Sequence, residues 1–408
     1  MSSQSLLVRK LVFAAYLAAA SFGSFWGAWG ASVPRLRIQA GVDDGQLGLA
    51  LLFIGAGALP AMLITGRALD RWGLRFAAAA IVALGLAGLG VSMTAHGFVA
   101  LCVGLAAVGL ASGATDVAMN SIAGRAEQAS GEAIIIRSGG VFSSFVVLAS
   151  ITTGLSSWIS APAFTPFLVV AVLSLVASAS VLRSLAPQGA TNPARTTPWA
   201  SEPNSGLGLG LRLRYAPLLL VGLLGALAFA SENAHQSWGA VFLEDQLGAG
   251  PGFSAVGPAV FAGVVAVTRF ALGRIQQGNE RVILTLGSLA AATGALIIAA
   301  SPAVPIAILG LIVAAAGTAA LYPTLLSLVS RGVAEEYRGR ATAIVTTVSY
   351  LGFLLGPVYV GIWSQAAGLR GAMVAVAALG VVLSALSIPL LHLSGFAGPE
   401  KRSVRLRN

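Results

Sequence analysis

Two continuous apolar runs are separated by the charged stretch Gly66-Arg67-Ala68-Leu69-Asp70-Arg71-Trp72-Gly73-Leu74-Arg75. The run before it covers 47–65, and the run after it covers 76–94. A helix needs about 20 consecutive apolar residues to cross the roughly 30 Å hydrocarbon core of a bilayer. Each run has about that length, so the sequence predicts two membrane-spanning helices joined by a short charged loop.

The composition of the whole chain agrees with this pattern. Hydrophobic residues make up 57% of the 408 residues and charged residues only 9%, with a mean hydropathy of +0.87. Soluble proteins carry about 25% charged residues, so most of this surface faces something other than water. We expect an all-α polytopic membrane protein with twelve spans, the first of them retained and not cleaved as a signal. The expected spans are 11–32, 47–65, 76–94, 98–122, 133–155, 164–182, 216–242, 256–272, 282–300, 304–329, 341–363 and 372–391.

The longest break between spans is rich in Pro, Ser, Thr, Asn and Gly, a composition typical of a linker. Short motifs also recur at offsets close to half the chain length. Trp29-Gly30-Ala31 recurs as Trp238-Gly239-Ala240, and Gly66-Arg67 recurs as Gly273-Arg274. A duplicated six-plus-six architecture explains both observations. The expected domains are an N-terminal six-helix half (1–183), a cytoplasmic linker (184–215), a C-terminal six-helix half (216–393) and a basic cytoplasmic tail (394–408).

The basic residues indicate the orientation in the membrane. The chain has 24 Lys and Arg against 14 Asp and Glu, a formal net charge of +10. With the amino terminus inside, only Arg35, Arg37 and Arg370 fall on the outer side, and Arg269 lies within the eighth span. Positive residues accumulate on the cytoplasmic side of membrane proteins, so we predict a bacterial inner-membrane protein with both termini in the cytoplasm. Because the charge is dispersed over many segments, we expect no nucleic-acid partner.

Few residues are suited to catalysis or metal binding. Cys102 is the single cysteine, and His96, His235 and His392 are scattered over different helices. Neither a G-x-x-x-x-G-K-[ST] loop nor an H-E-x-x-H motif occurs. We therefore expect no enzyme activity, no cofactor and no metal site. The expected partners are a small-molecule substrate, protons and the lipid bilayer, and the expected oligomeric state is a monomer.

The charged stretch at 66–75 resembles the signature loop of the major facilitator superfamily, G-x-x-x-D-R-x-G-R-R/K, with Leu74 where a basic residue is usual. With the twelve spans and the central linker, the resemblance covers nearly the whole chain. It implies two pseudo-symmetric six-helix halves, and a latch at Asp70 and Arg71 that holds the halves in one state of the transport cycle. A loop that only sets topology is the alternative. The matching positions are Gly66, Asp70, Arg71, Gly73 and Arg75.

Two further stretches resemble the fucose-permease-like bacterial branch of this superfamily. They are Asp116-Val117-Ala118-Met119-Asn120 in the fourth span and Ser231-Glu232-Asn233-Ala234-His235-Gln236-Ser237-Trp238 in the seventh. The sugar-transporting members carry an acid in the first span, whereas this chain has none there. The resemblance therefore implies uptake of a small polar solute without specifying a sugar.

Three charged residues lie well inside the expected spans: Asp116, Glu232 and Arg269. A charge at the bilayer centre costs about 2.5–3.5 kcal/mol on insertion scales, so such residues normally face the interior of a bundle. Asp116 shares a helical face with Asn120, and Glu232 shares one with Gln236, because each pair is four residues apart. At a rise of about 1.5 Å per residue along a helix, Asp116 lies about 13 Å from the inner boundary of the membrane and Glu232 about 27 Å.

We interpret Asp116 and Glu232 as proton-coupling groups, because burial disfavours the charged form of a carboxyl group and favours proton exchange. For Asp116 the alternative is a permanent hydrogen bond between helices; for Glu232 it is an outer gate contact or helix packing. Arg269 is expected to reach the inner headgroups or to form an intramembrane ion pair, in preference to binding substrate. The candidate substrate ligands beside these acids are Asn120, Asn233 and Gln236.

Aromatic residues are candidates to line a substrate cavity, because their rings and polar tips suit an amphipathic ligand. For Trp29 and Trp238 the alternative is an interfacial belt that anchors helix ends. The candidates are Trp26, Trp29, Trp238, Tyr322 and Tyr350.

The leading hypothesis is a secondary active transporter that works by alternating access, as a proton-coupled symporter of a small polar solute. Proton-driven efflux of a drug or metabolite is the alternative, because the first span is apolar and aromatic. A non-transporting membrane sensor on the same fold is the alternative from another class.

Overall fold

The computed structural model describes residues 3–132, 134–184, 215–272, 279–333 and 335–396. The expected linker falls almost entirely outside the described residues, as do Gly273-Arg274 of the second repeat and most of the expected tail. The domain boundaries there stay predictions. Every regular element within the described ranges is a helix.

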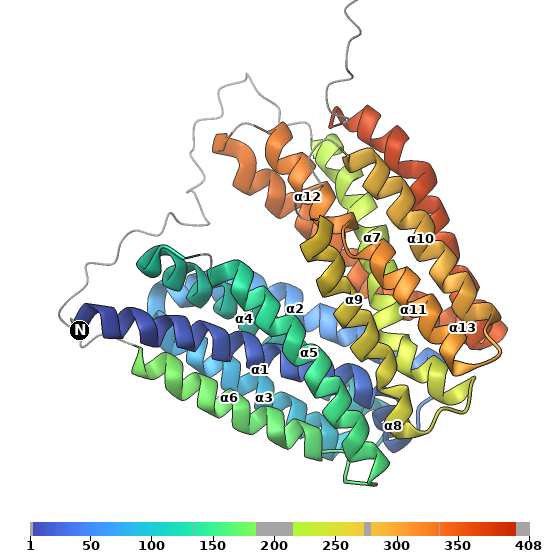
Figure 1. Ribbon diagram of the computed structural model, residues 1–408, viewed down its shortest axis with the longest axis horizontal. Helices are drawn as coiled ribbons and strands as arrows, with labels where there is room; N and C mark the ends of the chain where they lie inside the picture. Colours follow the sequence, from blue (N-terminus) through green and yellow to red (C-terminus); the bar gives the residue numbers. More distant parts are fainter. Residues whose placement is uncertain (1–2, 133, 185–214, 273–278, 334, 397–408) are drawn as a thin grey trace, which may run out of the picture.

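The first six helices form one bundle (Figure 1), in which α1 packs against α5 and α6, and α2 packs against α4. Gly23 and Gly27 allow α1 to approach α5 closely, because a Cβ atom at either position would lie 2.2 Å from a carbonyl oxygen of α5. Small residues permit this kind of packing between membrane helices. The bundle consists of α1 (Ser3–Ala40), α2 (Asp44–Trp72), α3 (Leu74–Thr94), α4 (Phe98–Ser130), α5 (Ile134–Trp158) and α6 (Thr165–Arg183).

The remaining helices form a second bundle, in which α7 packs against α13, and α10 packs against α11 and α13. Two apolar spans are each built from two consecutive helices, α8 with α9 and α11 with α12. The bundle consists of α7 (Tyr215–Asp245), α8 (Pro251–Ser254), α9 (Val256–Leu272), α10 (Glu280–Ala300), α11 (Val304–Thr318), α12 (Leu321–Gly332) and α13 (Glu335–Ser394).

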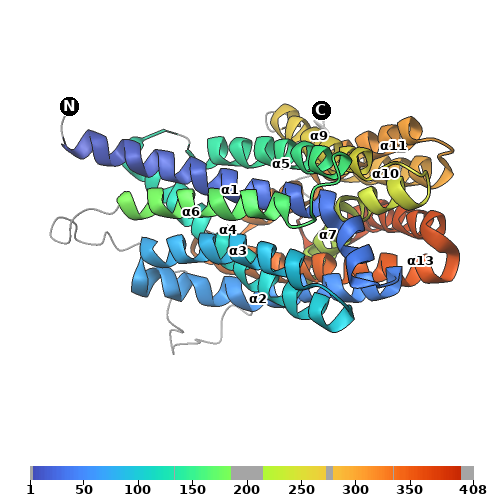
Figure 2. The same ribbon diagram turned by 90° about the horizontal axis from the view of Figure 1, so that it is seen from below.

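The 60-residue α13 contains two spans. Gly368 interrupts it with a φ of 69° and a ψ of 173°. The Tyr359 hydroxyl donates to the Ala375 carbonyl oxygen at 3.0 Å, although sixteen residues of continuous helix would separate them by about 24 Å. The chain therefore folds back at Gly368 (Figure 2), and the spans expected at 341–363 and 372–391 lie on either side.

The chain is a multi-pass membrane protein. Within the described ranges, eleven helices are long and apolar enough to cross a membrane. Because α13 holds two crossings, this count agrees with the twelve expected spans. Large apolar side chains such as Leu63, Val99 and Val169 are mostly exposed on these helices, as expected where lipid and not water surrounds them.

The stretch at 66–75 is not the loop that the sequence predicts. α2 continues to Trp72, and only Gly73, with a φ of 60°, separates it from α3. Ala68 and Leu69 are buried while Arg67, Asp70 and Arg71 are exposed, so the last turns of α2 are amphipathic and remain helical beyond the apolar run.

The two bundles meet at one end of the molecule and diverge toward the other (Figure 1). Contacts of α2 with α13, α5 with α8, and α1 with α7 cross between the bundles. We call the meeting end, which contains Arg37, Asp44, Asp245 and Ser364, the bridged end. The start of α1 lies at the opposite, divergent end.

Candidate functional site

A cavity of about 260 Å³ lies between the two bundles. Helices α1, α2, α4 and α5 line it from one side, and α7, α9 and α13 line it from the other. Most of its lining is apolar, with a few converging polar groups, which is the usual character of a small-molecule site. Besides Trp26 and Tyr350, the polar and charged lining residues are Ser112, Asp116, Ser143, Glu232, Gln236 and Arg269.

Arg269 and Glu232 form an ion pair in this cavity. The Arg269 Nη2 atom lies 3.0 Å from the Glu232 Oε1 atom, and the Arg269 Nε atom donates to the Ala319 carbonyl oxygen at 2.9 Å. Ala319 stands at the break between α11 and α12, where a backbone carbonyl is available. The Glu232 side chain is 17% exposed and that of Arg269 is 47% exposed. Removing either partner would leave a partly buried charge uncompensated.

Asp116 faces the cavity from the opposite half and is not paired with a cation among the described residues. Its carboxylate accepts a hydrogen bond from the Asn120 Nδ2 atom at 3.1 Å, which also donates to the Asp116 backbone carbonyl. Asn120 is exposed but does not line the cavity. It therefore orients Asp116 and is not placed to contact a molecule in the cavity directly.

Four other predicted substrate residues lie away from the cavity lining. Trp29 and Trp238 are 4% and 0% exposed and belong to the packed core. The Asn233 amide donates to the Phe353 carbonyl oxygen at 3.0 Å, and the Tyr322 hydroxyl donates to Thr346 at 2.9 Å. Their side chains connect helices, because helical rotation turns them from the cavity toward neighbouring spans.

The cavity also has residues that the sequence analysis did not single out. Five phenylalanines line it, but a cavity-facing phenylalanine has the same sequence pattern as a core or lipid-facing one. Only the packing of the two halves distinguishes them. They are Phe22, Phe142, Phe229, Phe261 and Phe353.

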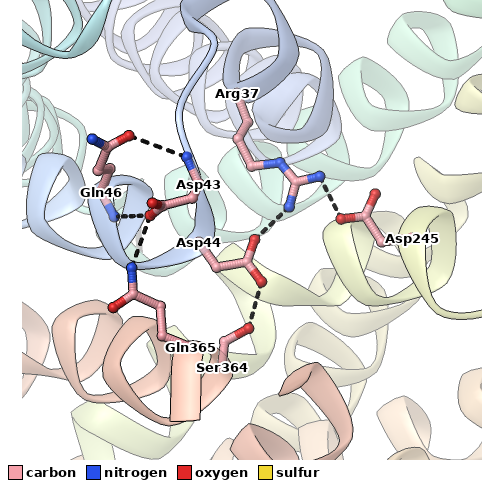
Figure 3. A network of polar contacts seen from close by, with 7 residues as sticks. All are labelled: Arg37, Asp43, Asp44, Gln46, Asp245, Ser364 and Gln365. Atoms are coloured by element: carbon pink, nitrogen blue, oxygen red, sulfur yellow. Dashed lines mark hydrogen bonds and ion pairs between the residues drawn. The ribbon is translucent and has the colours of Figure 1, made fainter. Parts of the chain in front are cut away.

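A polar network joins the halves at the bridged end (Figure 3). The Arg37 guanidinium, from the end of α1, donates to Asp44 at the start of α2 and to Asp245 at the end of α7. The second carboxylate oxygen of Asp44 accepts a hydrogen bond from Ser364 in α13. The side chains of Arg37, Asp44 and Asp245 are only 16%, 20% and 25% exposed. Partial burial and shared partners make such a network stronger than isolated surface pairs.

The first turn of α2 prepares this network. Asp43 is its N-cap: the Asp43 carboxylate accepts from the Gln46 backbone N–H at 2.8 Å, and the Gln46 side chain accepts from the Asp43 N–H. This capping box holds the turn in one conformation. The same Asp43 oxygen accepts from the Gln365 Nε2 atom of α13 at 3.0 Å, so one carboxylate caps a helix and ties the halves together.

The backbones of the two halves also touch beside this network. A Cβ atom at Gly48 of α2 would lie 2.7 Å from the Pro357 carbonyl oxygen and 3.1 Å from the Gly361 Cα atom of α13. The halves are therefore closed against each other at the bridged end. Sequence reasoning did not mark Asp44, Asp245 or Ser364, although Arg37 stood out as one of the few basic residues expected on the outer side.

The predicted latch residues lie elsewhere. Asp70, Arg71 and Arg75 are exposed around the α2–α3 turn. The Arg71 guanidinium lies 5.3 Å from the centre of the Trp72 ring, a cation–π contact. Among the residues that the structure describes, none forms an ion pair with Asp70 or Arg71.

Comparison with known proteins decides the family. The sequence profile of the Major Facilitator Superfamily matches residues 11–357 and 277–406, which together cover nearly all of the chain. The chain belongs to the major facilitator superfamily. An uncharacterized MFS-type transporter of Yersinia pestis is 29% identical over 88% of this chain and 90% of its own length. The membrane protein MosC of Rhizobium meliloti is 26% identical over 90% and 86%.

Solved structures of other major facilitator transporters share the fold. A point mutant of the nucleoside transporter NupG covers 94% of this chain and 99% of its own, with a TM-score of 0.74 and 15% identity. A bacterial homolog of the human lysosomal transporter Spinster, in an inward-facing and occupied conformation, covers 96% and 97%, with a TM-score of 0.71 and 15% identity. This protein is thus a major facilitator transporter and not an enzyme, while its branch stays a prediction.

Proposed function

We propose that this transporter couples solute movement to protons across a bacterial inner membrane, with both termini in the cytoplasm, and imports a small polar solute. The observation that carries the proposal is the cavity between the halves, which holds the Glu232–Arg269 ion pair opposite Asp116. A carboxylate inside a cavity is stable in its charged form when it is paired with a cation. It is also stable in its protonated form when another group binds that cation in its place.

The ion pair supplies a coupling mechanism. When Glu232 takes up a proton, its attraction for Arg269 falls and the Arg269 N–H groups become available to an acceptor on the solute. When Glu232 loses the proton, it competes for Arg269 and favours release of the solute. Asp116 supplies a second carboxylate at the same cavity from the other half.

The closed and divergent ends support one state of the transport cycle. With the amino terminus in the cytoplasm, the bridged end faces outward and the divergent end faces inward. This arrangement corresponds to an inward-facing state, in which Asp70 and Arg71 are released from the latch. Conversion to the outward-facing state requires the Arg37 network to break, as expected for rocking halves around a central site.

The experiment begins with a thermal-shift screen of sugars, nucleosides and other polar metabolites on the purified protein. Stabilising compounds are then tested for uptake into proteoliposomes under an imposed pH gradient. We expect accumulation with the gradient, and we expect Glu232→Gln and Asp116→Asn to abolish it while sparing exchange. Glu127→Gln changes an acid outside the cavity and is the control. Accumulation by both cavity variants at the normal level would refute proton coupling through these residues.

A specific observation favours a second function. Seven aromatic rings line the cavity, five of them from phenylalanine, and this lining suits an amphipathic compound that is exported in exchange for protons. Solute movement opposite to the proton gradient in the same proteoliposomes would establish efflux. Tight binding of a compound without movement in either direction would instead favour a sensor.

A further inference from the structure

A groove of about 200 Å³ lies between the first turns of α1 and the last turns of α6. Helices α1 and α6, which pack against each other, form its two walls. It is separate from the central cavity, which neither α6 nor the start of α1 lines. The groove is lined by Lys10, Phe13, Leu17, Val176, Ser180 and Arg183.

The lining residues of α1 and α6 lie opposite one another across the groove. Lys10, Phe13 and Leu17 occupy one face of α1, since they are three and seven positions apart. The two helices run antiparallel, and a hydrogen bond of 2.8 Å between Ser21 and Ser174 sets their register. In that register Arg183, Ser180 and Val176 each lie two residues, or about 3 Å along the helix, from the level of Lys10, Phe13 and Leu17 respectively. Both cations therefore stand at the mouth of the groove, and its apolar part extends about 10 Å deeper into the membrane.

The charge at the groove mouth is unbalanced. Neither α1 nor α6 contains a single Asp or Glu. Across the described part of the chain, neither Lys10 nor Arg183 forms an ion pair. Two cations at similar depth on adjoining helices repel each other unless an anion lies between them.

We propose that this groove binds an anionic diacyl phospholipid, with its phosphate between Lys10 and Arg183. One acyl chain lies along Phe13, Leu17 and Val176, of which Phe13 and Val176 are 58% and 51% exposed. The cations stand where the apolar spans end, which is the depth of lipid phosphates, and basic pockets between spans attract anionic headgroups. A zwitterionic lipid fits less well because its ammonium group would face the same two cations.

The test is native mass spectrometry of the purified protein with equimolar phosphatidylglycerol and phosphatidylcholine of identical chains. We expect phosphatidylglycerol adducts to exceed phosphatidylcholine adducts by about 10- to 30-fold, since two basic groups contribute. Lys10→Gln/Arg183→Gln should reduce this preference to near unity. The matched control is Arg9→Gln, which removes the same charge from a neighbouring exposed residue that does not line the groove.

Single variants and a soluble phosphate compound test the groove further. Each single variant, Lys10→Gln or Arg183→Gln, should lose about half of the preference on a logarithmic scale, while Lys10→Arg should retain it. An unchanged preference in the double variant, or an equal loss in Arg9→Gln, would overturn the site in favour of diffuse surface charge. Glycerol 3-phosphate, which has no acyl chains, should not displace the lipid; displacement would show a phosphate site only.

Discussion

Arg37 in the first half is ion-paired with Asp245 in the second half, across the interface that must open during transport. The same guanidinium also holds Asp44, so two carboxylates from different halves share one cation. Removing the cation does more than delete an attraction, because it leaves two negative charges facing each other. This relationship predicts, for each substitution in the network, whether the bridged end opens or closes.

Arg37→Gln should open the bridged end. Loss of a partly buried charge contact, with repulsion between the remaining carboxylates, should shift the equilibrium between states by about 1–2 kcal/mol, or roughly 5- to 30-fold. Spin labels at His96 and Ala303 can report this, because both are exposed and stand in loops near the bridged end, one on each half. In a Cys102→Ala background, electron–electron resonance should show a longer mean distance between the labels.

The Asp245→Asn variant tests whether Arg37→Gln opens the bridged end through repulsion between carboxylates or through a general loss of structure. Alone it should open the bridged end less than Arg37→Gln does, and when added to Arg37→Gln it should partly restore closure, because one carboxylate remains instead of two. Arg35→Gln is the matched control, since the hydrogen bonds of Arg35 to Ser157 and Ala161 lie within its own half. Additive opening in the double variant would contradict the electrostatic account.

Gly48→Val should also open the bridged end, by steric means. The new side chain would meet the Pro357 carbonyl and Gly361, contacts that exist only while the halves are closed. The label distance should increase with little loss of thermal stability. Gly57→Val is the comparison, because its side chain would meet Ala106 within the first half; it should destabilise the fold by about 1–3 kcal/mol without preferring the open state. Equal behaviour of both variants would contradict this assignment.

Arg269→Gln should destabilise the protein by about 1–3 kcal/mol, because the Glu232 carboxylate would be left without its partner. Adding Glu232→Gln should recover most of that loss, since two neutral side chains carry no uncompensated charge. Thermal unfolding of the single and double variants measures the coupling. Independent, additive losses would show that the ion pair contributes nothing to the fold.

Replacing either of two glycines near the turn after α2 with alanine should change the stability in opposite directions. Gly73 has a φ of 60° and a ψ of −147°, a conformation that is nearly exclusive to glycine, so Gly73→Ala should destabilise by about 1–3 kcal/mol. Gly66 lies within α2, and a Cβ atom there meets nothing within 4 Å; Gly66→Ala should stabilise by about 0.5–1 kcal/mol. Thermal unfolding of the two variants tests whether the turn, and not the motif as a whole, requires glycine.

The spans and the family could be predicted from the chain, whereas most of the residues that line the candidate site could not. Asp116, Glu232 and Arg269 were recognisable because a charge within an apolar run is costly and therefore conspicuous. Trp29 and Trp238 looked equally suitable for a cavity, yet both are buried in the core. The direction of an indole depends on how its helix is rotated against its neighbours, and local composition does not specify that rotation.

The sequence by itself determined the membrane-spanning character, the major facilitator fold and the family. These properties depend on hydrophobicity and motifs within runs of about twenty residues. The free energy of burying apolar surface is roughly the sum over the residues of each run, so each run can be recognised by itself. Only the tertiary structure decided that Arg37 meets Asp245, that Arg269 meets Glu232, and that the halves are closed at one end. Such contacts join residues far apart in the chain, and short-range hydrogen bonds form only after packing brings the helices into register.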